Sequence, residues 1–301
     1  MPIPVTLIGG YLGAGKTTLV NHLLREREGR RIAVLVNDFG ELPIDSELIE
    51  SRDGTLLQLA GGCVCCSFGS DLMAALQQML ALQPQPEHIL IETSGVALPG
   101  AVARTLGLLQ GLRLDAVLVL ADAETVHERA ADRYVGELVR EQLQQADLLL
   151  LNKTDLLPDA ALAPLHDWLG TAAPRARVVA TQQAQLAPAL LFGDAGFDTV
   201  PRRHGATIDA RALFDSLSLE FEHALDLPAL AEALAAVPLL RAKGLMRDRD
   251  GHLRSLQLVG RRCMLAEASP ATAQTGRLVC IALRGELQAE RIRAALAACA
   301  V

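Results

Sequence analysis

The sequence predicts an α/β fold in which a doubly wound, mostly parallel sheet is followed by a smaller α+β domain. Apolar runs alternate with amphipathic segments through the first two-thirds of the 301 residues, a pattern typical of parallel strands joined by helices. A glycine-rich loop follows the first apolar run. Beyond a polar, turn-rich stretch at 193–205 the apolar runs lie closer together, which indicates a second domain with a mainly antiparallel sheet.

The strand candidates of the first domain are short apolar runs, and several of them contain no polar residue. Unbroken runs such as 116–120 suit parallel strands that are buried on both faces. We expect these strands at 5–8, 32–36, 88–92, 116–120, 147–152 and 177–180. We expect the intervening helices at 17–28, 71–82, 100–109, 135–145 and 160–169.

The second domain is predicted from the shorter spacing of its apolar runs. We expect its strands at 216–221, 239–247, 253–265 and 278–283, and its helices at 227–236 and 286–299. The predicted boundaries are 1–195 for the first domain, 196–212 for a linker and 213–301 for the second domain.

The glycine-rich loop fits the phosphate-binding pattern G-x-x-x-x-G-K-[ST] from Gly10 to Thr17, between a predicted strand and a predicted helix. Its glycines would let backbone N–H groups surround a phosphate chain, and the helix end adds partial positive charge. Lys16 would reach the β- and γ-phosphates, and the Thr17 hydroxyl would hold Mg²⁺. The predicted nucleotide-binding residues are Gly10, Gly13, Ala14, Gly15, Lys16, Thr17 and Thr18. The alternative is a glycine-rich turn that binds no ligand.

A second motif, Asn152-Lys153-Thr154-Asp155, follows a predicted buried strand and fits the N-K-x-D pattern by which GTPases read guanine. Asp155 can accept hydrogen bonds from the guanine N1–H and N2–H₂ groups, which adenine cannot supply. Asn152 would contact the other edge of the ring, and the stem of Lys153 would pack along its face. The alternative is a helix-capping turn, because Thr and Asp are good caps. Together with the phosphate loop, the motif predicts that the sheet is of the P-loop GTPase type.

An acidic residue, Glu92, ends another apolar run, where P-loop proteins place a carboxylate near Mg²⁺ or the attacking water. The alternative is a surface carboxylate at the end of a strand. Three residues later, Gly95 could donate its N–H to the γ-phosphate and swing when that phosphate leaves.

Three of the six cysteines, Cys63, Cys65 and Cys66, form a C-x-C-C element. In a reducing compartment this clustering suggests metal or redox chemistry rather than disulfides. Thiolates are soft ligands that suit Zn²⁺, but cysteines so close in sequence cannot readily fill a tetrahedral site alone. Asp38 and Glu41 are therefore further candidate ligands. The alternative is three buried cysteines in a loop.

These motifs together resemble the CobW-type GTPases, which are related to the urease- and hydrogenase-maturation GTPases. The resemblance covers nearly the whole chain and rests on 9–18, 37–45, 61–66, 92–95, 152–155 and 241–244. It implies GTP hydrolysis coupled to the handling of a transition metal, with Lys16, Glu92 and Asp38 in catalytic roles. The family commonly reads N-E-F-G-E where this chain has N-D-F-G-E at 37–41, and many relatives carry a histidine-rich tract that this chain lacks.

We therefore expect a metallochaperone that uses GTP, Mg²⁺ and Zn²⁺ (or Co²⁺) and delivers metal to a client metalloprotein. The alternatives are a GTP-responsive metal sensor or buffer without client transfer, and a P-loop kinase of a small molecule. We expect a monomer or a dimer that depends on metal or nucleotide.

The composition argues against two other classes of partner. A formal net charge of −7 without any long basic run is not typical of a nucleic-acid-binding surface. No segment approaches the ~18 apolar residues that a membrane span requires. The amino terminus lacks the basic start and long apolar core of a signal peptide. We expect a cytoplasmic protein that binds neither nucleic acid nor membrane.

Overall fold

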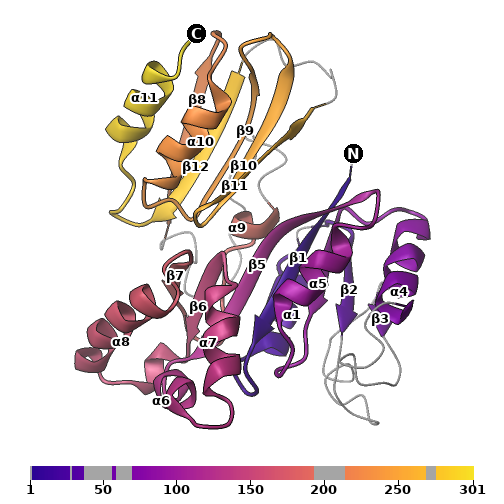
Figure 1. Ribbon diagram of the computed structural model, residues 1–301, viewed down its shortest axis with the longest axis vertical. Coiled ribbons are helices and arrows are strands. Elements are labelled where there is room, and N and C mark those ends of the chain that lie inside the picture. The colour runs from indigo at the N-terminus through magenta and orange to yellow at the C-terminus, as the bar shows by residue number, and fades with distance from the viewer. Residues whose placement is uncertain (1, 28, 37–55, 59–69, 193–213, 269–275) are drawn as a thin grey trace. The chain divides into compact units, whose positions relative to one another are not determined.

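The computed structural model describes residues 2–27, 29–36, 56–58, 70–192, 214–268 and 276–301. The chain divides into two compact units, Met1–Pro188 and Ala189–Val301, whose elements are labelled in Figure 1. The linker expected at 196–212 lies outside the described residues, so the domain boundaries stay a prediction.

The first unit contains a seven-stranded sheet in the order β3-β2-β4-β1-β5-β6-β7, and each of its described strand pairs is parallel. The strands are β1 (Ile3–Gly10), β2 (Ile32–Val36), β3 (Leu56–Gln58), β4 (His88–Glu92), β5 (Leu112–Asp122), β6 (Leu148–Asn152) and β7 (Arg177–Ala180). Both β2 and β6 are buried along their whole length, as expected for unbroken apolar runs. Because the strands are parallel, the loops that follow β1, β4, β5, β6 and β7 meet at one edge of the sheet.

Helices cover the sheet of the first unit. They are α1 (Lys16–Arg25), α4 (Ser70–Ala81), α5 (Pro99–Leu106), α6 (Val126–Ala131), α7 (Gly136–Gln144) and α8 (Asp159–Ala172), with a 3₁₀ turn η1 (Thr154–Leu156). Leu7 and Ile8 of β1 point to opposite faces of the sheet, and both are fully buried. Both faces are therefore covered, which confirms the doubly wound prediction. Among the described residues, none of the helices is long and apolar enough to cross a membrane.

The second unit contains a five-stranded antiparallel sheet in the order β11-β10-β9-β12-β8. Its strands are β8 (Phe214–Phe221), β9 (Arg241–Arg247), β10 (Leu253–Val259), β11 (Arg262–Glu267) and β12 (Gly276–Leu283). Helices α10 (Leu227–Ala235) and α11 (Ala289–Ala298) lie together on one face of this sheet and enclose a leucine-rich core with it (Figure 1). A short helix, α9 (Ala189–Phe192), precedes the sheet in the sequence. The α+β prediction is confirmed.

One predicted strand, 253–265, is wrong, because this segment forms the hairpin of β10 and β11. Val259 pairs with Arg262 across a two-residue turn. Gly260, the first residue of that turn, has a φ of 59°. Glycine adopts a positive φ at low cost, so it lets the two strands fold back on each other.

Candidate functional site

The phosphate loop joins the carboxyl end of β1 to the start of α1, as predicted. Gly10 has a φ of 130°, and a Cβ there would overlap the carbonyl oxygen of Leu120 on β5. Gly15 has a φ of 103° and lies so close to Asn152 that a Cβ would be 2.5 Å from its Nδ2 atom. Only glycine fits these two positions, because each combines a positive φ with a close neighbour.

The amino end of α1 offers donors for an anion. Its first turn contains no acidic residue, so the partial positive charge of the helix end is not neutralised there. Lys16 is only 8% exposed, and its Nζ donates to the carbonyl oxygen of Tyr11 at 3.4 Å, across the loop. Thr18 is exposed at the same end of the helix. A buried ammonium group beside the amino end of a helix fits a phosphate chain.

Thr17 and Glu92 meet beside the phosphate loop. The parallel register pairs Ile8 with Glu92, which places the end of β4 next to the start of the loop. The Thr17 hydroxyl donates to Glu92 Oε1 at 2.9 Å, and the Glu92 side chain is 2% exposed. The alternative of a surface carboxylate is therefore wrong. A hydroxyl and a carboxylate supply the oxygen ligands that Mg²⁺ prefers, so these residues fit that ion.

Gly95 lies directly against the phosphate loop. It is buried, and a Cβ there would be 2.9 Å from the backbone nitrogen of Leu12. The segment that carries Gly95 is fixed at its start, because the Thr93 N–H donates to the Ile8 carbonyl oxygen at 2.9 Å. The sequence expectation that Gly95 accompanies the phosphate site is thus compatible with its position.

Asn152 joins the phosphate loop to a loop after β7. Its Nδ2 donates to the Ala14 carbonyl oxygen at 2.9 Å, and its Oδ1 accepts from the Ala184 N–H at 2.8 Å. The side chain is 2% exposed. The sequence predicted a contact between Asn152 and a base, and the structure adds this bridging role. An amide has two N–H donors, so a contact with guanine stays compatible with the bridge.

The rest of the N-K-x-D motif is held from two sides. Lys153 has a φ of 65°, and its Nζ forms an ion pair with Asp122 Oδ2 at 2.5 Å. The Thr154 hydroxyl donates to the Thr181 carbonyl oxygen at 3.1 Å, while Asp155 is exposed. In the described part of the chain, no side chain caps η1 or α8, which argues against the helix-capping alternative.

Two parts of this site were missed in the sequence. One is Asp122, at the end of β5, which holds Lys153. The other is the loop 181–185 after β7, where Gln183 and Ala184 have φ values of 49° and 53°. Both begin within two residues of the end of a predicted strand, so their position at the carboxyl edge of the sheet was the available signal.

The candidate metal ligands fall outside the described residues. These ligands are Asp38, Glu41, Cys63, Cys65 and Cys66. The metal site that they were predicted to form therefore stays a prediction.

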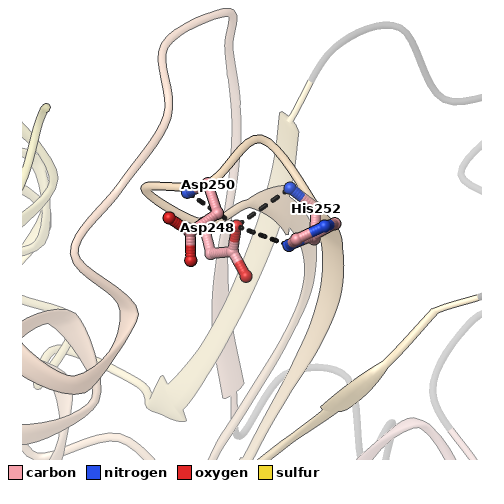
Figure 2. Close-up of side chains that lie close together, drawn as sticks. All are labelled: Asp248, Asp250 and His252. Carbon is pink, nitrogen blue, oxygen red and sulfur yellow. Dashed lines mark hydrogen bonds and ion pairs between the residues drawn. The ribbon is translucent and has the colours of Figure 1, made fainter.

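In the part of the chain that the structure describes, one group of three potential ligands lies close together, Asp248, Asp250 and His252 (Figure 2). The Asp248 carboxylate accepts from the N–H groups of Asp250 at 3.0 Å and His252 at 2.9 Å, and from Arg254 Nε at 2.9 Å. The hydrogen bond from Arg254 is the main cause that lowers the pKa of Asp248 below its ordinary value. These contacts explain the group as the turn between β9 and β10, and we assign no metal to it.

Burial disfavours the thiolate form of the three cysteines in the second unit. Burial raises the pKa of Cys263 to about 11 and that of Cys280 to about 12. Burial also raises the pKa of Cys299. These thiols stay protonated at neutral pH, whereas metal binding needs thiolate.

The 241–244 element of the family resemblance lies in β9. Arg241 is 1% exposed and donates to the Leu190 carbonyl oxygen at 2.7 Å. Lys243 donates to the Phe192 carbonyl oxygen at 3.3 Å. Both acceptors lie in α9, whose last carbonyls lack partners within the helix. Within the second unit, this element therefore attaches α9 to the sheet.

Comparison with known families gives two matches that follow one another along the chain. Residues 4–180 match the CobW/HypB/UreG nucleotide-binding domain. Residues 214–300 match the C-terminal domain of the cobalamin synthesis protein cobW.

Curated relatives and solved structures give similar results. The chain is 35% identical to the zinc chaperone YjiA of Escherichia coli over 268 residues, which cover 81% of this chain and 82% of the relative. It is 33% identical to the zinc chaperone CobW of Pseudomonas aeruginosa over an alignment of 304 positions, gaps included, that covers 86% of this chain and 81% of the relative. The crystal structure of the Zn(II)-bound YjiA GTPase from E. coli matches along the whole of both chains, with 28% identity and a TM-score of 0.50.

Proposed function

The chain belongs to the CobW/HypB/UreG family, and from this premise we propose that it hydrolyses GTP and delivers zinc to a client metalloprotein. The names of its relatives, zinc chaperone and zinc-regulated GTPase metalloprotein activator, support the metal and the existence of a client. Cobalt is the second candidate metal, because sites with thiolate ligands accept several divalent ions.

The observation that carries the nucleotide proposal is the double hydrogen bond of Asn152. The buried Asn152 amide belongs to the N-K-x-D motif, which would bind the base. It binds Ala14 in the phosphate loop and Ala184 in the loop after β7, and so connects the two halves of the proposed site. A glycine-rich turn without a ligand does not require such a connection. A nucleotide does, because its phosphates and its base must be bound at a fixed separation.

Each residue of the site has a proposed role in binding. Lys16 and the backbone of the phosphate loop bind the β- and γ-phosphates. Thr17 and Glu92 would hold Mg²⁺, which would supply positive charge against the negative charge on the phosphates. Asp155 accepts from the guanine N1–H and N2–H₂ groups, and Lys153, held by Asp122, packs along the ring.

For hydrolysis, we propose that Glu92 orients water near the γ-phosphate. Its side chain is buried at the end of β4, next to Thr17. Lys16 is also buried, and charges act more strongly in such a poorly hydrated site than in water. We assign no arginine finger, so intrinsic turnover should be slow, on the order of 10⁻³ s⁻¹ as in unassisted GTPases.

The zinc is proposed to bind Cys63, Cys65 and Cys66, with Asp38 or Glu41 supplying oxygen. The thiolates supply the soft ligands that zinc favours, and the carboxylates complete a tetrahedral set. The segment with Asp38 and Glu41 and the segment with the cysteines both lie in the sequence between Thr17 and Glu92, which would hold the nucleotide. A bound nucleotide and a bound metal can therefore favour the same conformation of these segments.

The nucleotide part is tested by titrating GTP and ATP analogues against the wild type, Asp155→Ala and Asp159→Ala. The wild type should prefer the GTP analogue, and Asp155→Ala should lose that preference. Asp159 is an exposed carboxylate at the start of α8, so its variant is the matched control and should behave like the wild type. A wild type that prefers ATP would refute the GTPase proposal and favour a kinase.

The metal part is tested by titrating Zn²⁺ with and without a GTP analogue. We expect zinc affinity to change about fivefold or more with nucleotide, within the usual range of coupling between sites. The Cys65→Ala/Cys66→Ala variant should lose the high-affinity site, and Cys263→Ala, in the second unit, should keep it. Zinc binding that ignores nucleotide, with no client captured in the GTP state, would indicate a buffer or sensor instead.

A further inference from the structure

Gln142 is a buried polar residue on the apolar face of α7. It is 1% exposed, and its neighbours on that face, Val139 and Leu143, belong to the hydrophobic core. A leucine would fill such a position without the cost of burying an amide. Buried polar groups persist where they make hydrogen bonds, so the contacts of Gln142 indicate its purpose.

Both contacts go to the segment 93–98, which connects β4 to α5. The Nε2 atom of Gln142 donates to the Gly95 carbonyl oxygen at 3.1 Å and to the Ala97 carbonyl oxygen at 2.8 Å. An amide nitrogen has two hydrogens, so this side chain uses its full donor capacity on one segment. Gln145, the residue directly after α7, accepts a hydrogen bond through its side-chain oxygen from the Gly100 N–H at 2.7 Å, where α5 begins.

The same segment touches the phosphate loop on another side. Gly95 lies against Leu12 so closely that a Cβ would be 2.9 Å from the Leu12 backbone nitrogen. Gln142 also lines a small cavity beneath the loop, together with Tyr11, Leu12 and Ala14. The Gly95 backbone is thus fixed between the phosphate loop and the amide of Gln142.

The Gly95 N–H is available to a ligand. Gly95 is buried, and among the residues that the structure describes its N–H donates to no acceptor. Buried N–H groups are nearly always paired, so a leftover donor beside a phosphate loop fits a phosphate oxygen. The direction of this N–H depends on the two peptide groups that flank Gly95. Gln142 fixes the one that follows, because it binds the Gly95 carbonyl oxygen.

We propose that Gln142 is a positioning residue for the nucleotide site, which holds the Gly95 backbone ready for the γ-phosphate and so favours GTP over GDP. This inference rests on the proposed GTPase function and adds a residue that touches neither nucleotide nor metal. Its effect is specific to the γ-phosphate, because GDP has no group at that position.

The test compares Gln142→Met with the wild type. Methionine keeps the volume and the flexibility of glutamine but removes both donors. Affinity for a non-hydrolysable GTP analogue should fall about tenfold, in the range typical of coupling between sites, while GDP affinity stays nearly unchanged. Hydrogen exchange of the amides at 93–98 should speed up in the nucleotide-free variant, which is a readout independent of turnover.

Leu143→Ala is the matched control, because it loosens the core at the next residue of α7 without removing a bond to 93–98. It should lower stability and leave the ratio of GTP to GDP affinity unchanged. If Gln142→Met does not fold, Gln142→Leu serves the same comparison.

The inference is overturned if Gln142→Met lowers the affinities for the GTP analogue and for GDP equally. It is also overturned if the ratio of GTP to GDP affinity stays unchanged or rises. Either result leaves the GTPase proposal standing. A wild type that binds neither nucleotide would refute both.

Discussion

The bridge made by Asn152 gives the sharpest test of the site's construction. Asn152→Ala removes the bonds to the Ala14 carbonyl oxygen and the Ala184 N–H. Two hydrogen bonds contribute about 1 kcal/mol each, and each abandoned buried partner costs about 1–3 kcal/mol unless water reaches it. Because removal of the Asn152 side chain leaves room for water beside both partners, we expect the free energy of unfolding of the first unit to fall by about 2–4 kcal/mol.

This loss can be followed in the first unit alone. Trp168 is the only tryptophan of the chain and lies in α8, so its fluorescence reports the unfolding of that unit. For a domain of this size each kcal/mol corresponds to about 2–4 °C, so the Tm should fall by roughly 4–16 °C. GDP affinity should fall at least about tenfold, because the two halves of the site are no longer held together.

The matched control is Thr154→Val, which removes one hydrogen bond, to the Thr181 carbonyl oxygen, on the same side of the site. It should lower the free energy of unfolding by about 1 kcal/mol and keep the hydrogen bond between Asn152 and the phosphate loop. The reasoning is refuted if Asn152→Ala unfolds within about 1 °C of the wild type and binds GDP normally. It is also refuted if Thr154→Val weakens GDP binding as much.

Three further predictions concern separate parts of the molecule. Gly15→Ala should abolish GDP binding and lower the Tm, because Gly15 has a φ of 103° and a Cβ there would overlap the Asn152 amide. Gly170→Ala is the control and should keep GDP binding, because a Cβ at Gly170 on α8 meets open space. A Gly15→Ala variant with normal GDP affinity would contradict the loop geometry. Asp155→Asn should lower the affinity for GTP about a hundredfold or more and favour XTP, since the new amide can donate to the xanthine C2 carbonyl. Competition binding between GTP and XTP checks this, and an unchanged GTP affinity would contradict it. The lowered pKa of Asp248 stabilises the fold above its ordinary value of 3.8, and this contribution disappears as pH falls through the lowered pKa. The Tm difference between wild type and Asp248→Asn should therefore be constant near neutral pH and shrink below about pH 4, and a difference that grows in acid would contradict the contact with Arg254.

The sequence was informative where a local pattern and a physical need coincide. Unbroken apolar runs such as β6 identified buried parallel strands, and the pattern from Gly10 to Thr17 identified the phosphate loop. Such features depend on residues that are neighbours in the chain. Their chemistry can therefore be read without knowing the tertiary structure.

The sequence was less informative where a feature depends on distant residues. The bridging role of Asn152 requires Ala14 and Ala184, which belong to loops on either side of it in the fold. Gln142 looked like one polar residue in an amphipathic helix, because its partners lie 45 and 47 residues away. The six-residue helix α6 was missed because it is too short to show a helical repeat.

The position of β1 in the sheet has a consequence for how the protein is made. This strand is synthesised before the other strands of its sheet, yet it pairs Val5 with Ile89 and Thr6 with Ala116, so both of its neighbours come much later. Contacts of this separation form slowly, because a long chain must be ordered before they are made. Asn152 and Ala184 are later still. During synthesis the phosphate loop therefore lacks its contacts with β4, β5 and Asn152 until these segments have been made. A nucleotide can first bind when nearly the whole of the first unit has left the ribosome.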